Sequence, residues 1–584
     1  MVKYRCYFEL VKYLLKNYLF LFIGNPKKYL KAILTFRSDS LPWLQRYQEL
    51  HSDHFMVYLK PNVVIEPLYK RWYAWPHLIS PVTAVLNVTG RHIKIMESYI
   101  QAPQIHANAI RNQRMRGGPF MDHDPSRVDE VIDLLDHTRR DQNELIQFSD
   151  NIKSFDKTLR QQAKGYGLKS IYNLIPERLR GYAELVYDLN DNVSIRFFES
   201  LLYASPFYQT SAQSISMWLT DNDERPFVLS TPRLGETNVL DLNIPFSDAF
   251  IDQLGKMKRT SHPFKEIRDM IEVPENKEEL FNTFFTEIPP PAYSKYLGDK
   301  VRMRYFGHAC ILIETKNISI LLDPLVSYYG YPQELDRFSD MDLPDKIDYV
   351  LITHNHQDHI LLETLLPLRH KIGHIIVPKT SNGAIQDPSL KMMFNHIGFK
   401  NVFEIGEMQR IESDLCVITG LPFVGEHCDL NIQSKTCYHV AVEKFSMLFM
   451  ADSCNIEPRV YEHVAGVIGR TDVVFLGMEC EGAPLTWLYG PLLSDEIARE
   501  KDETRRLNGS NFQQGRAIVE TFRPKEVYVY AMGQEPWLEF ISSIKYTPES
   551  HPITQSNMLI EYCEKKGMTA ERLFGEKEIL YSKT

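Results

Sequence analysis

The sequence has no long uncharged apolar run, no C-x-x-C pair and no excess of basic residues, and each absence excludes a class of protein. The apolar residues near its start are interrupted by Arg5, Glu9, Lys12 and Lys16, which argues against a cleavable signal peptide and against a membrane-spanning helix. Eight cysteines without regular spacing are typical of reduced thiols in a cytoplasmic protein. A net charge of −9 argues against nucleic acid as the main partner.

The first half of the chain also lacks an internal repeat, a glycine-rich phosphate loop and a nucleophile elbow. Apolar residues recur at helical spacing from Val128 to Leu159, which predicts a long core-facing helical segment. Residues 225–232 and 239–244 are typical of short strands. We therefore predict a mostly helical N-terminal domain over residues 1–270, serving dimerisation or the docking of a substrate carrier.

Residues 1–37 combine eight Lys or Arg residues and one acid with Tyr, Phe and Leu. A basic amphipathic helix of this kind could lie on an anionic membrane surface. Packing against its own domain or against a second copy of the chain is the commoner outcome, and we expect a homodimer.

A linker is predicted at residues 271–298. A helix over 275–286 is followed by three consecutive prolines, 289–291, which cannot continue it. Beyond the linker the pattern changes to consecutive strands at 301–306, 309–314 and 318–324, and later strands alternate with helices. This alternation predicts an α/β fold for residues 299–584, with two sheets stacked between helical layers in an αββα sandwich.

One short stretch carries most of the chemistry. His354, His356, Asp358 and His359 directly follow the β-branched, apolar run of residues 347–353, which reads as a buried strand ending in a loop. Residues two apart in such a loop can point the same way, so His354 and His356 could reach one ion while Asp358 and His359 reach a second. Imidazoles with an added carboxylate suit several transition metals.

The order H-x-H-x-D-H resembles the metal-binding motif of the metallo-β-lactamase superfamily. The corners Gly307-His308 and Leu322-Asp323-Pro324 resemble the opening signature of the same fold. The resemblance implies that Asp452, which ends the apolar run 446–451, is a carboxylate bridging two metal ions. Without the resemblance, a lone aspartate after a strand would be read as a turn former.

A further ligand is expected in residues 425–429, where Glu426 and His427 compete. Most hydrolases of the superfamily use histidine here. The sequence is more similar to a smaller branch, the di-iron β-hydroxylases of the chloramphenicol-biosynthesis type, which use glutamate. That branch implies a large helical N-terminal domain, a second glutamate near the metals at Glu479, and dioxygen with an external electron donor as co-reactants. The alternative for Glu479 is a solvated loop carboxylate.

The superfamily's last histidine is missing after the strand of residues 526–530. Glu535 is our first candidate to replace it, because Gly533 permits the turn that would bring it to the sheet edge. His551 is the alternative, although Pro552 restricts its backbone. Water could also complete this shell.

Two classes of function follow. In the first, two metal ions, with iron favoured over manganese or zinc, serve an oxygenase that hydroxylates an amino-acid-like small molecule or carrier-tethered substrate, with Glu426 and Glu479 as its catalytic carboxylates. In the second, a metallohydrolase attacks an ester, amide, lactone or phosphodiester, and His427 is the ligand with Glu426 behind it. A scaffold with a relict site is disfavoured by the intact four-residue loop.

Overall fold

A computed structural model describes residues 55–113, 115–333 and 335–582 of the chain. The chain divides into two units. As far as it is described, the smaller unit consists of residues 55–57 and His262–Glu272, in which β8 (His262–Pro263) pairs antiparallel with the start of β1 (Met56–Leu59) and leads into α12 (Phe264–Asp269). Every described residue named below as part of the metal centre belongs to the larger unit, Tyr58–Ser261 with Val273–Thr584.

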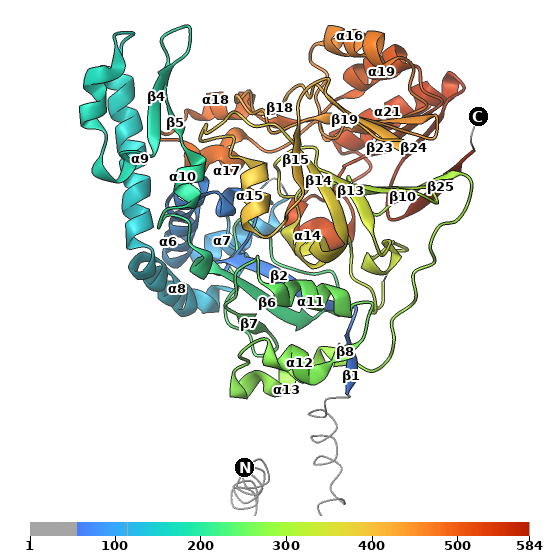
Figure 1. The fold of residues 1–584 in the computed structure, drawn as a ribbon. Helices are drawn as coiled ribbons and strands as arrows, with labels where there is room; N and C mark the ends of the chain where they lie inside the picture. Colours follow the sequence, from blue (N-terminus) through green and yellow to red (C-terminus); the bar gives the residue numbers. More distant parts are fainter. Residues whose placement is uncertain (1–54, 114, 334, 583–584) are drawn as a thin grey trace, which may run out of the picture. The chain divides into compact units, whose positions relative to one another are not determined.

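The C-terminal half contains two seven-stranded sheets in the described chain (Figure 1). The first has the order β15-β14-β13-β12-β11-β10-β25, with parallel pairing from β12 to β15. Its strands are β10 (Val301–Tyr305), β11 (Ile311–Glu314), β12 (Ser319–Leu322), β13 (Ile347–Leu351), β14 (Ile372–Pro378), β15 (Val402–Ile405) and β25 (Lys577–Tyr581).

The second sheet has the order β16-β17-β19-β20-β21-β23-β24 and is parallel from β20 onward. Its strands are β16 (Arg410–Glu412), β17 (Cys416–Leu421), β19 (Cys437–Val442), β20 (Phe445–Phe449), β21 (Val473–Gly477), β23 (Glu526–Tyr530) and β24 (Thr569–Arg572). Leu351 and Ile376 of the first sheet share one buried core with Tyr438 and Phe475 of the second, so the sheets are stacked face to face.

Helices cover the outer faces of both sheets. Against the second sheet, Tyr461 of α16, Ile518 of α19 and Leu559 of α21 join a separate buried cluster. Helices α14 and α15 lie beside β13 to β15 of the first sheet (Figure 1). Their bounds are α14 (Leu362–Leu368), α15 (Leu390–His396), α16 (Pro458–Ile468), α17 (Leu485–Tyr489), α18 (Arg499–Thr504), α19 (Phe512–Phe522), α20 (Glu539–Ser542) and α21 (His551–Lys565). The predicted αββα sandwich is confirmed.

The N-terminal half is built from helices around a four-stranded sheet of order β3-β2-β6-β7. Its strands are β2 (Val63–Tyr69), β3 (Trp72–Tyr73), β6 (Gln213–Leu219) and β7 (Leu240–Leu242), and β4 (Ala183–Tyr187) with β5 (Val193–Phe197) forms a hairpin. Its helices are α4 (Pro76–Ile79), α5 (Pro81–Asn87), α6 (Ile93–Gln101), α7 (Pro103–Arg111), α8 (Val128–Asp141), α9 (Asn143–Gln162), α10 (Glu199–Tyr203) and α11 (Ala249–Met257).

Three details differ from the sequence-based expectation. The segment 225–232 forms no strand, because Pro226 and Pro232 lack the amide donors that a ladder needs. The helical segment from Val128 is broken at Gln142 into α8 and α9. The helix predicted at 275–286 is shorter, since α13 (Glu278–Thr283) is followed by β9 (Phe285–Thr286), which pairs with the end of β1.

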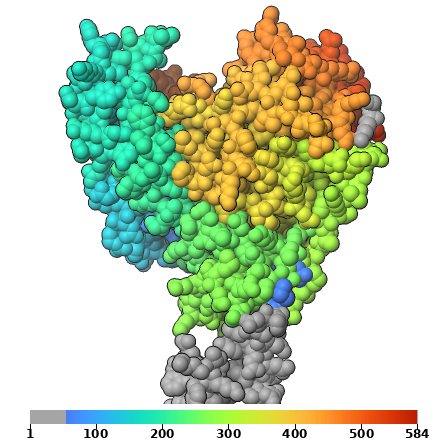
Figure 2. Space-filling model, viewed as in Figure 1, coloured from blue at the N-terminus to red at the C-terminus, as the bar shows by residue number. Residues whose placement is uncertain are grey.

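The two halves of the larger unit are in direct backbone contact. The amide of Phe197, at the end of β5, donates to the carbonyl of Gly383 at 2.8 Å. A Cβ at position 383 would lie 2.0 Å from the Phe197 carbonyl oxygen, so only glycine fits. Figure 2 shows the teal-green atoms of this hairpin region directly beside the yellow atoms of the C-terminal half.

Among the described residues, no helix is both long and apolar enough to cross a membrane. The membrane contact considered for residues 1–37 lies outside the described residues.

Candidate metal centre

The metal loop, residues 352–361, leaves the carboxyl end of β13 and leads into α14. The Thr353 carbonyl accepts a hydrogen bond from the amide of Thr436 at 2.7 Å, which ties the loop to the second sheet. A turn in which the carbonyl of His356 accepts from the amides of His359 and Ile360 reverses the chain. The loop's four predicted ligands thereby face the edge shared by both sheets.

Asp452 and His359 define the middle of the centre. The Asp452 carboxylate oxygen Oδ2 lies 3.0 Å from Nε2 of His359 and 3.7 Å from Nε2 of His354. Burial lowers the pKa of His354 well below its usual value, with the neighbouring His359 as the next cause. These three residues place their ligand atoms close enough to share one ion.

Position 452 depends on a glycine in the neighbouring strand. Asp452 follows β20 through Ala451, whose amide donates to the Tyr530 hydroxyl at 3.0 Å. A Cβ on Gly477, at the end of β21, would lie 2.4 Å from the Ala451 carbonyl and 2.8 Å from Oδ1 of Asp452. A side chain at 477 would therefore displace the aspartate.

Glu426 forms a second group with His354 and His356. Its Oε1 atom lies 3.1 Å from Nδ1 of His356. Burial raises the pKa of Glu426, but His356 and His427 outweigh it and hold the pKa below its usual range. The Glu426 backbone has φ of +66°, a left-handed conformation that costs a non-glycine residue free energy and is often found at functional sites.

His427 lies beside this group without being part of it. Its ring is stacked on that of His356 at 4.5 Å, and its Nδ1 contacts the Glu426 carboxylate. Of the two competing residues, it is Glu426 whose ligand atom is grouped with those of His354 and His356. Burial lowers the pKa of His427 to about 4.

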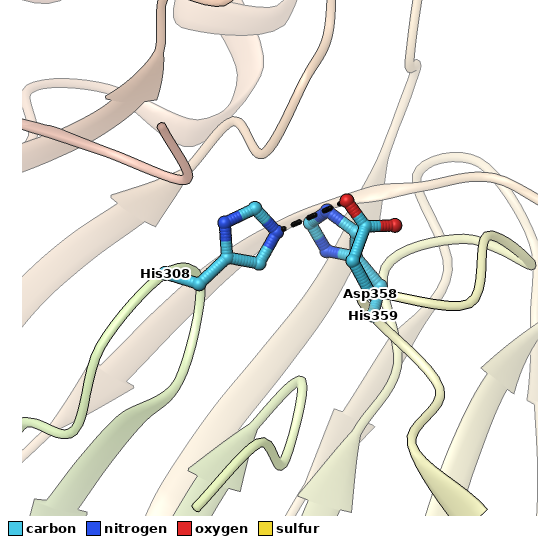
Figure 3. Close-up of side chains that lie close together, drawn as sticks. All are labelled: His308, Asp358 and His359. Carbon is cyan, nitrogen blue, oxygen red and sulfur yellow. Dashed lines mark ion pairs between the residues drawn. The ribbon is translucent and has the colours of Figure 1, made fainter. Parts of the chain in front are cut away.

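A third group consists of His308, Asp358 and His359 (Figure 3). Nε2 of His308 lies 3.3 Å from Oδ2 of Asp358, and the His308 and His359 rings are 4.8 Å apart. Sequence reasoning noted the Gly307-His308 corner as a fold signature but did not predict His308 as a ligand. The sequence feature that could have identified His308 as a ligand is this corner, which forms the turn between β10 and β11.

Glu535 and His551, the candidates for the missing histidine, lie outside the three groups. Glu535 is buried and accepts a hydrogen bond from the Tyr305 hydroxyl. Burial raises the pKa of Glu535, and the Tyr305 hydrogen bond and the nearby His308 imidazole only partly offset this increase. His551 is exposed at the start of α21 and belongs to none of the three groups.

Glu479 lies two residues beyond β21. Its Oε1 accepts a hydrogen bond from the amide of Glu481 at 2.9 Å. Burial, together with the charge of Asp452, raises the pKa of Glu479 to about 8. The side chain is thus close enough to Asp452 to sense its charge, and is not fully solvated.

Two residues orient the imidazoles: Asp323, which the sequence marked only as part of a fold signature, and Tyr489, to which it gave no role at the centre. Asp323 Oδ2 accepts from Nδ1 of His359 at 2.8 Å and from the Thr353 hydroxyl at 2.6 Å. Tyr489 is hydrogen-bonded through its hydroxyl to Nε2 of His356 at 2.8 Å. Such contacts fix the tautomer and leave the other ring nitrogen free for a metal.

These residues fit two metal ions. Several buried atoms that face the centre have no hydrogen-bond partner in the described chain, and such orphans are rare because each is costly. They are Nε2 of His354, both ring nitrogens of His308 and of His427, Oδ1 of Asp452, and Oε2 of Glu426, Glu479 and Glu535. A mixture of imidazoles and carboxylates suits iron, and two bound cations would satisfy these atoms.

Both halves of the chain are similar to known proteins. Residues 58–289 match the family model of the diiron non-heme beta-hydroxylase N-terminal domain, and residues 319–481 match that of the beta-lactamase superfamily domain. The chain is 38% identical over 526 residues to the 3-hydroxylase of 4-amino-L-phenylalanyl-CmlP-peptidyl-carrier-protein from Streptomyces venezuelae, covering 88% of this chain and 98% of that one.

A solved structure is similar over the same length. The crystal structure of CmlA, a diiron beta-hydroxylase from Streptomyces venezuelae, matches with a TM-score of 0.84 at 36% identity, covering 90% of this chain and 99% of that one. A metal-dependent hydrolase of Anoxybacillus flavithermus is 25% identical over 150 residues, which is 24% of this chain and 62% of that protein. The resemblance predicted from the motifs is confirmed.

Proposed function

The chain belongs to the diiron β-hydroxylase family, and on that premise we propose that it hydroxylates the β-carbon of an aminoacyl group tethered to a carrier protein. The relative from Streptomyces venezuelae is named for such a substrate. The overall reaction inserts one oxygen atom of dioxygen into a C–H bond and reduces the other to water, with two electrons and two protons from outside.

The proposed ligands follow the three groups. His354, His356 and Glu426 would hold one iron, Asp358 and His359 the other, and Asp452 both. The two irons supply the activation of dioxygen, a chemistry that no side chain of this protein offers by itself. In this arrangement Asp452 occupies the middle because its Oδ2 atom approaches His354 and His359 from one position.

The observation that carries the oxygenase assignment is the grouping of Glu426, rather than His427, with His354 and His356. A carboxylate at this position adds negative charge to the centre, which favours iron in its higher oxidation states over zinc. Tyr489 and Asp323 would hold the imidazoles in orientation, and the burial of His354, His356 and His359 excludes bulk water from the loop.

For the second iron we propose His308 as a further donor beside Asp358 and His359. Its Nε2 is 3.3 Å from Asp358 and has no hydrogen-bond partner among the described residues. Glu535 would then act through Tyr305 and His308 rather than as a direct ligand. Glu479, with an unpartnered Oε2 near Asp452, would hold a proton at the edge of the centre.

A metallohydrolase remains the second candidate, since the chain is locally similar to metal-dependent hydrolases. In that case His427 would be the ligand, and the protein would bind zinc and hydrolyse esters or phosphodiesters. A homodimer and a cytoplasmic location stay predictions, to be tested by chromatography with light scattering and by cell fractionation.

The test of the proposed function is a single-turnover reaction. Chemically reduced, iron-loaded protein is mixed with dioxygen and a carrier protein loaded with an aromatic amino acid, and the carrier is analysed by mass spectrometry. We expect the tethered amino acid to gain one oxygen atom, derived from labelled dioxygen. Zinc-containing protein that hydrolyses esters and leaves the carrier unchanged would support the hydrolase instead.

A further inference from the structure

A cavity of about 240 Å³ lies where α11 of the N-terminal half packs against α14 of the C-terminal half. The helices are in backbone contact at its wall, because a Cβ on Gly255 would lie 2.0 Å from the carbonyl oxygen of Pro367. Figure 1 shows the two helices side by side. None of the metal-centre residues lines this cavity.

The cavity has an excess of positive charge. Its basic residues are Lys256, Lys258, Arg259 and Lys371, and its acidic residues are Asp340, Asp345 and Glu363. Three of these charges are neutralised by direct pairing: Lys258 and Asp340 pair with each other at 2.5 Å, and Glu363 pairs with Arg225, which lies outside the cavity lining, at 2.8 Å.

What remains is one acid facing three cations. The Arg259 guanidinium donates to backbone carbonyls, including that of Asp340 at 3.1 Å, and so keeps its charge. Lys256, Arg259 and Lys371 therefore face Asp345 alone. The cavity carries two positive charges in excess.

Lys371 is the most unusual of these cations. It is half-buried, and within the described part of the chain no hydrogen bond or ion pair reaches its amine. Burial, followed by the charge of Arg259, lowers the pKa of Lys371 to about 8. Only Asp345, and Asp340 that already pairs with Lys258, offset this ammonium group, and an anion in the cavity would compensate its charge more fully.

We propose that this cavity binds a phosphoryl group, and that the group is the phosphodiester of the phosphopantetheine arm on the carrier protein. Two lysines and an arginine with unused charge are the residue types that recognise phosphate. The identity of the ligand rests on the proposed function. The cavity's capacity to bind a phosphoryl anion does not.

The position of the cavity fits an arm that continues toward the metals. Its wall at Tyr328 and Glu363 is shared with a smaller cavity of about 30 Å³, which is also lined by Leu361 and Trp537. Leu361 ends the metal loop, and the Trp537 indole lies against Gly307, the neighbour of His308. A phosphate in the larger cavity would leave the thiol end of the arm directed along α14 to the loop.

Calorimetry on the full-length protein tests the site with three probes: 4′-phosphopantetheine, pantetheine without the phosphate, and inorganic phosphate. We expect phosphopantetheine to bind at least about tenfold more tightly than pantetheine, which is the worth of one charged hydrogen bond. Lys371→Met and Lys256→Met should each reduce this ratio, and the double variant should abolish it. The exposed Lys169, remote in sequence from the cavity, provides a matched control as Lys169→Met.

Equal binding of the two pantetheines, or an unchanged ratio in both lysine variants, would refute the site. Because Lys256 is exposed, Lys256→Met should fold normally, and its binding ratio tests the site even if Lys371→Met proves unstable. Inorganic phosphate that binds as tightly as phosphopantetheine would contradict the arm as the source. A protein that discriminates the phosphate but never hydroxylates a carrier-bound amino acid would refute the proposed function alone, whereas a working hydroxylase without discrimination would refute the site alone.

Discussion

Two groups of buried charges lie on either side of the start of α14, and they differ in how they are satisfied. In the Arg225 cluster, consisting of Glu66, Arg225, Arg233 and Glu363, every charge is paired: Arg225 donates to Glu363 at 2.8 and 2.9 Å and to Glu66 at 2.6 Å, and Arg233 binds Glu66 through two bonds of 2.8 Å. In the metal centre, by contrast, several buried nitrogens and oxygens have no partner among the described residues.

The difference separates structure from function. The Arg225 cluster joins β2 of the N-terminal half to α14 of the C-terminal half, and its charges are paired with one another, with only Nε of Arg225 lacking a hydrogen-bond partner among the described residues. The metal centre is incomplete without a cation, since its free ligand atoms converge. Substitutions in the first should therefore change the free energy of unfolding, and substitutions in the second should change metal content and activity.

The largest effect is expected for Asp452→Ala. Because this carboxylate lies between both groups of imidazoles, we expect the variant to lose both irons and to lose activity by more than about 1,000-fold, well beyond the 10–100-fold typical of residues that only support a ligand. Metal analysis after purification and the single-turnover assay measure this. A variant that keeps both irons would disprove the bridging role.

Arg225→Met should destabilise the folded protein at the Arg225 cluster. It leaves Glu66 and Glu363 buried without their common partner, so the free energy of unfolding should fall by about 3–5 kcal/mol, measured by chemical denaturation. Arg499→Met, which removes an exposed ion pair with Glu503, is the control and should change it by less than about 1 kcal/mol. An equal effect of the two substitutions would contradict the structural role of the Arg225 cluster.

Glu426→Gln and His427→Ala distinguish the two candidate ligands within the metal centre. If Glu426 is the ligand, its variant should lose about 100-fold in iron affinity, while His427→Ala loses less than about tenfold. Titration of the metal-free proteins with ferrous iron gives both values. The reverse order would favour the hydrolase assignment.

Removing the metal should expose a pH dependence that originates at Glu479. Its pKa is raised to about 8 in the folded state, so between its unfolded value and pH 8 the folded protein binds the extra proton. The folded state is therefore stabilised at low pH, and this contribution to the free energy of unfolding is lost progressively as the pH rises to 8. Between pH 6 and pH 9 the loss is on the order of 2 kcal/mol. Thermal unfolding of chelator-treated protein at pH 6 and 9 measures it, and Glu479→Gln should flatten the profile.

The smallest effect is expected for Tyr489→Phe. Losing the hydroxyl that is hydrogen-bonded to His356 should weaken iron binding by about tenfold without a large change in stability. Tyr528→Phe, whose hydroxyl binds Glu526 on β23, is a matched control that should leave iron affinity unchanged. Iron affinities that are the same in both variants would mean that Tyr489 only packs.

The strand that precedes the metal loop and the αββα layers could be predicted because apolar runs mark them locally, whereas the ligand roles of Asp452 and Glu426 followed only from the family resemblance. Tyr489, 133 residues from His356, has no such pattern, and the same holds for Arg225, which pairs with Glu363 138 residues away. Glu535 was predicted from the strand 526–530 and the turn at Gly533, which would bring it to the sheet edge; its carboxylate accepts a hydrogen bond from the Tyr305 hydroxyl, and His308 is the residue that lies next to Asp358.

The most direct test of the account is anomalous X-ray diffraction at the iron edge from crystals of the iron-loaded protein. We predict two iron peaks, one between His354, His356 and Glu426 and one beside Asp358 and His359, with the Asp452 carboxylate between them. A single peak, or a pair coordinated by His427 with Glu426 turned away, would contradict it.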